Sequence, residues 1–308
     1  MDIILKFISY LTLFMTLAGF LRSYWWGFTA FGFFRPQYAV LSFLGLIGAF
    51  LLSMPFLIFI NAISFATNMF LLQGWFPRKH EPDAGAIHIA SINTWKSNRK
   101  RDKLIQYIDK HAPEVLLLME VTEELKESCA KIFDNYPYHL SHYVRDGFEI
   151  WLLSKHEMHE TQIFNIGVEE GQTPLLSCRI MIAGRMYRLL SAHPRPAINR
   201  DYARSRIDYF EEFSRIVHKS REPVIALGDF NSVPWEPHFK DFLDHTKMRS
   251  TMELTGYRMT WPRYFRPMGI PMDHILISRS ITPKGLAVGP DVGSDHYPVA
   301  LQLEVFEE

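Results

Sequence analysis

Gly-Ser-Asp-His-Tyr-Pro at residues 293–298 and Gly-Asp-Phe-Asn at residues 228–231 are the two most informative segments of this 308-residue chain. Each places a carboxylate within two residues of a second polar group suited to phosphate ester chemistry. Asp295 and His296 together are able to bind a divalent metal and to move a proton. Asp229 and Asn231 are two residues apart, so their side chains point the same way on an extended backbone. Either segment alone is a common polar turn, but we interpret the two together as parts of one site.

Further polar residues stand at the ends of apolar runs. Short apolar runs bounded by turn residues indicate strands. A strand holds the residue at its end in place while the following loop stays open to ligand. We therefore expect these strand ends to converge in one cluster. The runs are residues 86–92, 115–119, 188–192 and 223–227, which stop at Asn93, Glu120, His193 and Gly228-Asp229.

In this order, the motifs resemble the endonuclease/exonuclease/phosphatase superfamily. Its members include deoxyribonuclease I, abasic-site endonucleases, neutral sphingomyelinases and inositol polyphosphate 5-phosphatases. The resemblance covers residues 86–305. In detail, the chain is similar to bacterial members that have apolar N-terminal segments and the motif Gly-Asp-Phe-Asn-x-x-Pro-Trp, which here ends at Trp235. The residues that carry the resemblance are Asn93, Glu120, His193, Asp229, Asn231, Asp273, Asp295 and His296.

The resemblance implies an α/β (α+β) fold, namely a four-layer α/β sandwich of two packed mixed sheets flanked by helices, with the site at one sheet edge. The residue pattern agrees with mixed helices and strands in a single domain. Helices are predicted over residues 100–111, 122–133 and 201–218. Strands are predicted over residues 148–153, 175–182, 186–190, 274–277 and 299–303.

The resemblance also implies a metal-dependent phosphoric ester hydrolase. Asn93 and Glu120 offer hard oxygen ligands, which suit Mg²⁺ or Mn²⁺, and Asp295 adds a third ligand directly or through water. Asp229 is expected to orient or deprotonate the attacking water, and Asn231 to donate to a phosphoryl oxygen.

Two imidazoles complete the expected catalytic set. Asp273 is expected to fix the tautomer of His296, so that His296 holds a phosphate oxygen or relays a proton. His193 is the second imidazole. His274 lies beside Asp273 but on the opposite face of its strand, so we exclude it from the site.

The N-terminal quarter is apolar enough to meet a bilayer. Residues 3–21 form an apolar run, and residues 39–72 contain no charged residue. About 20 apolar residues span a bilayer as a helix, so a turn at Ser53-Met54-Pro55 gives three spans and its absence gives two. We predict a transmembrane anchor over residues 1–75, a hinge at 78–85 and a catalytic domain over 76–308. The alternatives are a cleaved signal peptide at 3–21 and a buried helical subdomain.

The expected location is a bacterial inner membrane, with the lipid bilayer as partner of the N-terminal helices. Basic residues at 78–79 and 99–103 favour a cytoplasmic catalytic domain under the positive-inside rule. The break at Pro55 and the membrane-anchored relatives favour the extracytoplasmic side, which we prefer. Cys129 and Cys178 are either two buried thiols or one bridge. No sequence feature calls for an obligate protein partner.

Charge bears on the substrate. The whole chain balances its basic and acidic residues, with 33 of each. Positions 1–75 contain Lys6, Arg22, Arg35 and Asp2 as their charged residues, so the remainder carries a slight acidic excess. Proteins that bind long nucleic acids usually show a basic footprint, so nucleic acid is the less favoured partner. We interpret the local arginines as the solvated face of a helix; these are Arg195, Arg200, Arg204 and Arg206.

The loop at residues 257–272 mixes arginines with aromatic residues, and we expect it to form a substrate wall. Trp261, Arg263 and Arg266 are its predicted substrate-binding residues. Three functions fit: a membrane-anchored phosphoesterase acting on a lipid head group or small phosphoester, a membrane-tethered Mg²⁺-dependent endo- or exonuclease, and a catalytically inactive binding module. We favour the first, because of the anchor, the near-neutral charge and the aromatic loop.

Overall fold

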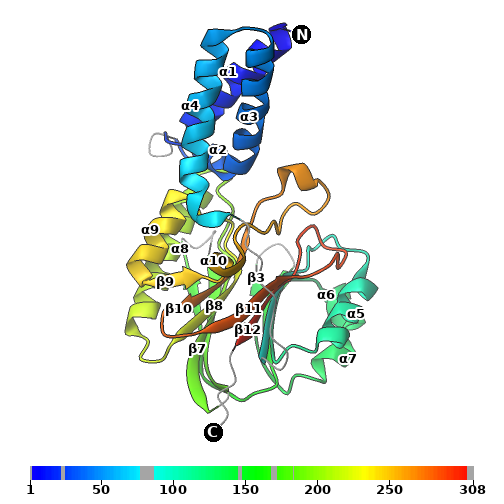
Figure 1. Ribbon diagram of the computed structural model, residues 1–308. Coiled ribbons are helices and arrows are strands. Elements are labelled where there is room, and N and C mark those ends of the chain that lie inside the picture. The colour runs from blue at the N-terminus through cyan, green and yellow to red at the C-terminus, as the bar shows by residue number, and fades with distance from the viewer. Residues whose placement is uncertain are drawn as a thin grey trace.

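The protein has a helical N-terminal region that stands on one end of a β-sandwich (Figure 1). This computed structural model describes residues 2–21, 25–76, 87–144, 148–167, 172–182 and 184–303. The predicted hinge at 78–85 lies outside the described residues.

The sandwich consists of two six-stranded sheets. Both are mixed, because β1 runs parallel to β2 and β7 runs parallel to β8, while the other described pairs are antiparallel. The order in the first sheet is β11 (Pro283–Val288), β12 (Val299–Leu303), β1 (Ile87–Asn93), β2 (Val115–Val121), β4 (Phe148–Ser154), β3 (Tyr138–Val144). The order in the second is β5 (Met158–Ile166), β6 (Thr173–Ile182), β7 (Arg185–Ala192), β8 (Val224–Asp229), β10 (Asp273–Ser278), β9 (Met248–Ser250).

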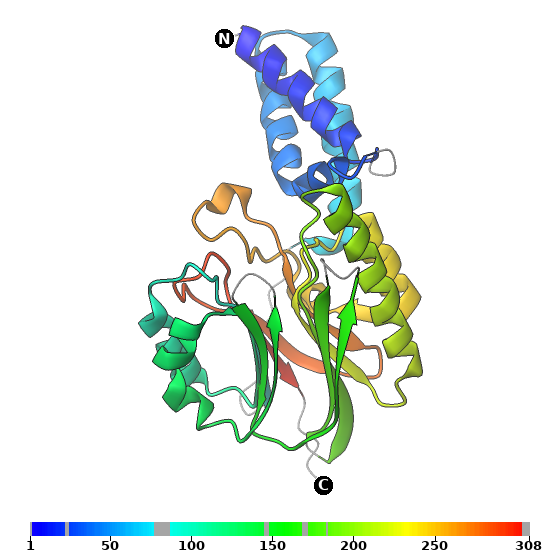
Figure 2. The same cartoon turned by 180° about the vertical axis from the view of Figure 1, so that it is seen from behind.

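The central strands are apolar on both faces because both faces are covered. In β2, Leu117 packs into the core between the sheets, whereas Leu116 packs under the outer helices, as the alternation of side chains along a strand requires. In β8, Leu227 and Ala226 divide in the same way. The outer helices lie on opposite sides of the sandwich (Figure 2). These helices are α5 (Arg101–His111), α6 (Glu123–Ser128) and α7 (Ala130–Phe133) over the first sheet, and α8 (Arg200–Lys219) and α9 (Pro237–Thr246) over the second.

The predicted sandwich of two mixed sheets with helices outside is therefore confirmed. The helix predicted at 122–133 is two short helices that meet at Cys129. Strands β3, β5, β9 and β11 and helix α9 were not predicted. Cys129 and Cys178 lie in different core clusters, so they are two buried free thiols and do not form a bridge with each other.

The helical region contains α1 (Asp2–Ala18), α2 (Phe28–Phe33), α3 (Arg35–Leu51), α4 (Pro55–Leu72) and the 3₁₀ turn η1 (Gln73–Trp75). A turn does separate α3 from α4, and Pro55 occupies the first position of α4, where proline is tolerated. Among the described helices, the stretch Pro55–Trp75 has the length and mean hydropathy (1.8) needed to cross a membrane. Helix α3 is apolar but shorter, at 17 residues.

The helical region buries polar side chains beside a small apolar cluster of Ala49, Leu57 and Ile60, and it is apolar outside. Asn61 donates to Ser9 Oγ at 2.8 Å, and Asn68 donates to Thr16 Oγ1 at 2.9 Å, so polar side chains join α4 to α1. Ser9, Thr16, Asn61 and Asn68 are all buried. Large apolar side chains point outward instead, among them Ile4, Phe7, Phe14, Leu44, Ile47, Phe50, Leu51, Phe56, Phe59 and Phe70.

The helical region is also joined to the sandwich. Trp235 Nε1 donates to the carbonyl oxygens of Gly32 and Phe33 at 3.0 and 3.3 Å. Gln37 Nε2 donates to the carbonyl oxygens of Pro267 and Gly269 at 3.2 and 3.0 Å. A shared apolar cluster surrounds these hydrogen bonds, so the α2–α3 junction is fixed beside the loop at 257–272. The cluster includes Phe33, Phe34, Ala39, Phe65, Leu72, Trp75, Val233, Trp235, Tyr257, Trp261, Ile270 and Met272.

Candidate active site

The polar residues at the strand ends converge at the end of the sandwich that faces the helical region. Asn93 ends β1, and Glu120 lies next to it near the end of the parallel neighbour β2. His193 follows β7, and Asp229 ends the parallel neighbour β8. Asp273 begins β10 directly opposite Asp229 in the antiparallel register. Parallel and antiparallel pairing therefore bring carboxylates from three strands to one edge, as the sequence predicts.

Positive φ angles occur at three positions in and beside this cluster, Gly228, Glu120 and Asn231. Gly228 has a φ of +152°, and a Cβ there would lie 1.8 Å from the carbonyl oxygen of Ala192. Only glycine therefore fits before Asp229. Glu120 and Asn231 themselves have positive φ values of 56° and 48°. Non-glycine residues in the left-handed region are strained and concentrate at functional sites. The chain holds these side chains in place at a conformational cost.

Asn93, Glu120, Asp229 and His193 form one contact network. Asn93 Nδ2 donates to Glu120 Oε1 at 3.1 Å and to Asp229 Oδ2 at 3.2 Å. His193 Nε2 lies 4.0 Å from Glu120 Oε1 and 3.8 Å from Asp229 Oδ2. The Lys96 amide donates to the other Glu120 oxygen at 3.0 Å. Two carboxylates thus share one amide and one imidazole.

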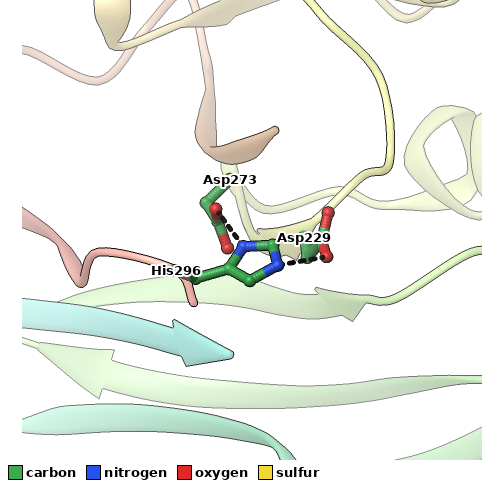
Figure 3. Close-up of side chains that lie close together, drawn as sticks. All are labelled: Asp229, Asp273 and His296. Carbon is green, nitrogen blue, oxygen red and sulfur yellow. Dashed lines mark hydrogen bonds and ion pairs between the residues drawn. The ribbon is translucent and has the colours of Figure 1, made fainter. Parts of the chain in front are cut away.

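His296 lies between two further carboxylate contacts (Figure 3). Its Nδ1 is 2.8 Å from Asp273 Oδ2, and its Nε2 is 3.8 Å from Asp229 Oδ2. Burial acts to lower the pKa of His296, but Asp273 and Asp229 outweigh burial and raise that pKa to about 10. The ring is therefore an imidazolium near neutral pH, with Nδ1–H donating to Asp273 and Nε2–H directed toward Asp229.

The carboxylates differ in protonation. Burial raises the pKa of Asp229 to about 6, while His296 acts against this shift and Asp273 adds to it. Burial also raises the pKa of Asp295, with His296 opposing. Burial acts to raise the pKa of Glu120. His193, the Lys96 amide and Asn93 outweigh burial and lower this pKa below its usual value. Glu120 is therefore ionised, whereas Asp229 titrates near the pH at which a general base works best.

Two sets of residues have the chemistry to bind a divalent metal. Asp229, Asp273 and His296 each bring a ligand atom within 4.8 Å of the others, but a protonated His296 has no free lone pair for a metal. The second set is Asn93, Glu120 and Asp295. Among the described residues, Asp295 Oδ1 is buried without a hydrogen-bond partner, and such an atom is suited to a cation. The second set therefore fits a divalent metal better, and it keeps His296 free for catalysis.

These residues line a cleft of about 530 Å³. Of the predicted site residues, Asn93, Glu120, His193, Asp229, Asn231, Trp261, Asp295 and His296 line it, and Asp273 supports His296 from behind. Trp261 Nε1 donates to Asp295 Oδ2 at 3.1 Å. Arg263 does not line the cleft; it pairs with Asp291 at 3.1 Å and donates to the Ser294 carbonyl at 2.6 Å, which holds the loop before Asp295. Arg266 is exposed outside the cleft.

Other cleft residues were not predicted. Trp95 and Lys96 follow Asn93 directly, so their place next to a strand-end residue could have revealed them. Ala30, Phe33 and Phe34 come from the α2–α3 junction, far away in sequence. Arg206 was expected on a solvated helix face, and that expectation is wrong. Its guanidinium is buried because Asn231 and Ser232 accept hydrogen bonds from it, each at 2.8 Å, and Glu236 lies 3.7 Å away.

The fold and the site together define a metal-dependent phosphoric ester hydrolase. The chain belongs to the Endonuclease/Exonuclease/phosphatase family, whose model matches residues 90–296. A search of curated protein sequences finds no significant match.

Solved structures with the same fold include a functionally unknown conserved protein from Enterococcus faecalis V583 (TM-score 0.60, 18% identity, 71% of this chain and 99% of that chain). A second is D. rerio TDP2 complexed with single strand DNA product (TM-score 0.59, 17% identity, 71% and 99%). A third is the 3'-5' exonuclease NExo from Neisseria meningitidis (TM-score 0.58, 16% identity, 71% and 100%). At these identities the likeness concerns the fold.

Proposed function

We propose that this protein is a membrane-anchored, Mg²⁺-dependent phosphoesterase that hydrolyses the phosphoester of a lipid head group or of another small molecule. Residues 1–75 form the anchor and residues 76–308 the catalytic domain. The observation that carries the proposal is the placement of an ionised, strand-end cluster next to a helical region that is apolar on its outside. The exposed apolar side chains of that region suit contact with lipid, and hydrogen bonds from Arg35, Asn61 and Asn68 join its helices on the inside.

In the proposed hydrolysis, each side chain has a role that suits its position. Asp229 accepts a proton from the attacking water, whose oxygen forms the new P–O bond as the ester P–O bond breaks. His296 and Asn231 lie at the same cleft to hold phosphoryl oxygens, and His193 supplies a proton to the leaving oxygen. Mg²⁺ held by Asn93, Glu120 and Asp295 would act as a Lewis acid on the phosphoryl group.

A second candidate function is a membrane-tethered Mg²⁺-dependent nuclease. The observation in its favour is the shared fold with TDP2 in complex with single strand DNA product and with the exonuclease NExo. The lining of the cleft argues for the small or lipid-borne phosphoester instead. Lys96 is its sole lysine or arginine among the described lining residues, whereas nucleic-acid channels usually carry a basic groove along the backbone.

The arrangement of the helices supports an extracytoplasmic catalytic domain at a bacterial inner membrane. The N-terminus lies at the end of the helical region far from the sandwich (Figure 1). Helices α1, α3 and α4 run between these two ends, so three crossings would place the N-terminus and the sandwich on opposite sides. A cytoplasmic N-terminus then puts the site outside.

The test is a substrate screen with the full chain in detergent. Activity with Mg²⁺ is measured on phospholipids, inositol phosphates and single-stranded DNA, with Glu120→Ala as the inactive comparison. We expect Mg²⁺-dependent release from a small or lipid phosphoester and little DNA cleavage. DNA cleavage as the dominant activity would favour the nuclease, and hydrolysis that survives Glu120→Ala would refute the site. C-terminal reporter fusions test the side of the membrane.

A further inference from the structure

The cleft is lined by polar and by apolar side chains. Glu120, Asp229 and His296 are among the polar ones. Many of the apolar ones form two groups, here called walls, which come from parts of the chain far apart in sequence. One wall is the α2–α3 junction, with Ala30, Phe33 and Phe34, and the other is the loop after β7, with Pro196, Ala197 and Ile198. The phosphoester chemistry described above uses neither wall.

The junction wall is held firmly beside the catalytic residues. Trp235 Nε1 donates to the carbonyl oxygens of Gly32 and Phe33. The Arg206 guanidinium lies 6.0 Å from the centre of the Phe33 ring and donates to the Asn231 carbonyl at 2.8 Å. One buried arginine therefore contacts both the apolar wall and the loop that carries Asn231. The wall has a fixed position relative to the phosphoryl site.

Each wall leaves an apolar side chain exposed. Ile198 in the loop after β7 is 64% exposed, and Ala30 at the α2–α3 junction is also exposed. A ligand that covered these side chains with another apolar group would gain free energy from burial, which is the largest favourable contribution to most binding. A cleft of about 530 Å³ is within the range that holds a ligand of moderate size.

We infer that the α2–α3 junction and the loop at 196–198 form a subsite for the apolar chain of a membrane lipid whose phosphoester is hydrolysed at Glu120, Asp229 and His296. This inference rests on the proposed function and specifies its substrate class. The helical region that supplies Phe33 and Phe34 is apolar over its outer surface, so the subsite is continuous with the part of the protein suited to a bilayer. Single-stranded nucleic acid also stacks on aromatic rings, but it requires the cationic groove that this cleft lacks among its described residues.

The experiment compares two chromogenic phosphodiesters on the full chain in detergent with Mg²⁺. One is p-nitrophenyl methyl phosphate and the other is p-nitrophenyl octyl phosphate. For the wild type we expect a higher kcat/KM on the octyl ester, by up to about fourfold for each methylene that becomes buried. Hydrolysis of the methyl ester tests the proposed function, and the octyl-to-methyl ratio tests the subsite.

Three variants make the ratio specific to the cleft. Ile198→Ser and Ala30→Asp change exposed positions, and each should lower the octyl-to-methyl ratio by about fivefold or more, because each replaces apolar surface with a polar group. Ile163→Ser is the matched control, because Ile163 is 37% exposed on β5 outside this cleft, and it should keep the wild-type ratio.

Two outcomes would overturn the subsite while leaving phosphoesterase activity standing. One is a wild-type ratio near one. The other is a ratio that Ile163→Ser lowers as much as Ile198→Ser does. Faster hydrolysis of single-stranded DNA than of the octyl ester would also contradict a lipid substrate. Loss of hydrolysis on every ester would instead refute the proposed function.

Discussion

The sandwich and the helical region differ in the polarity of the side chains that they bury. Between the sheets, the core cluster is apolar, with residues such as Leu117, Ile275 and Leu301. In the helical region, polar residues such as Thr16 and Asn68 are buried along with apolar ones such as Leu57, and phenylalanines and leucines face outward. An apolar interior is the pattern expected in water, where burial of apolar surface drives folding. A polar interior with an apolar exterior is the pattern expected where the surroundings are as apolar as leucine.

The candidate active site lies where the two regions meet, and it differs from both. Polar groups inside the helical region are neutral or cationic; Asn61, Asn68 and Arg35 are hydrogen-bonded within it, whereas the Ser42 and Ser64 hydroxyls have no partner among the described residues. In the site, several buried groups are ionised, and Asp295 Oδ1 and Asp273 Oδ1 have no hydrogen-bond partner among the described residues. A buried oxygen without a partner is costly unless a ligand satisfies it. What distinguishes the site is that its buried oxygens without a partner belong to carboxylates, which are suited to a metal or a substrate proton.

The largest effect is expected from removing a site carboxylate. Asp229→Asn keeps the shape of the side chain but cannot accept a proton, so kcat should fall by about 10²- to 10⁴-fold. The thermal midpoint should not fall, because the variant removes a carboxylate whose charged form is disfavoured by burial. Asp134→Asn, at an exposed position, is the matched control and should leave both quantities unchanged. Wild-type kcat in Asp229→Asn would show that Asp229 is not the base.

The pH profile should come next in size. Asp229 must be ionised to accept a proton, and its pKa is about 6, so kcat should rise with pH through about 6. His296 must stay protonated, and its pKa is about 10, so kcat should fall again only above that pH. Asp273→Asn removes a carboxylate that raises the pKa of His296 and should therefore move the alkaline limb to lower pH. A profile with its maximum below pH 5 would contradict the assigned protonation states.

A leucine in each region tests the comparison through stability. Leu301 is fully buried between the sheets, whereas Leu44 on α3 is 57% exposed. Leu301→Ala empties its position and should lower the free energy of unfolding by about 2–5 kcal/mol. Leu44→Ala should lower it in detergent by about 0.5 kcal/mol or less, as exposed substitutions usually do. Denaturant titration of the full chain measures both. If Leu44→Ala lowered the free energy of unfolding as much as Leu301→Ala does, α3 would be packed against something other than detergent or lipid.

The sequence predicted the site better than its surroundings, for a physical reason. Asn93, Glu120, His193 and Asp229 could be located because polarity changes sharply where each buried strand ends. Strand β5 was missed because most of its side chains are exposed, so its sequence lacks the apolar pattern of a buried strand. The contact of Phe33 with the cleft could not be predicted, since it depends on how α2 packs against a part of the chain that is remote in sequence. The burial of Arg206 could not be predicted either, because it depends on contacts with Asn231 and Glu236, which come from a later part of the chain.

The smallest effect concerns the polar interior of the helical region. Asn68 donates to Thr16 Oγ1 and accepts from Arg35 at 3.2 Å, so Asn68→Ala removes hydrogen bonds between α1, α3 and α4. Hydrogen bonds between helices in a membrane contribute about 0.6–2 kcal/mol each, and we expect a loss of that size. The control is Asn135→Ala, at an exposed position in the sandwich, which should change stability by about 0.5 kcal/mol or less. Unfolding in a detergent titration measures both variants. If Asn68→Ala lowered stability no more than Asn135→Ala does, the buried polar groups would not hold the helices together. The two regions would then differ only in the polarity of their surfaces.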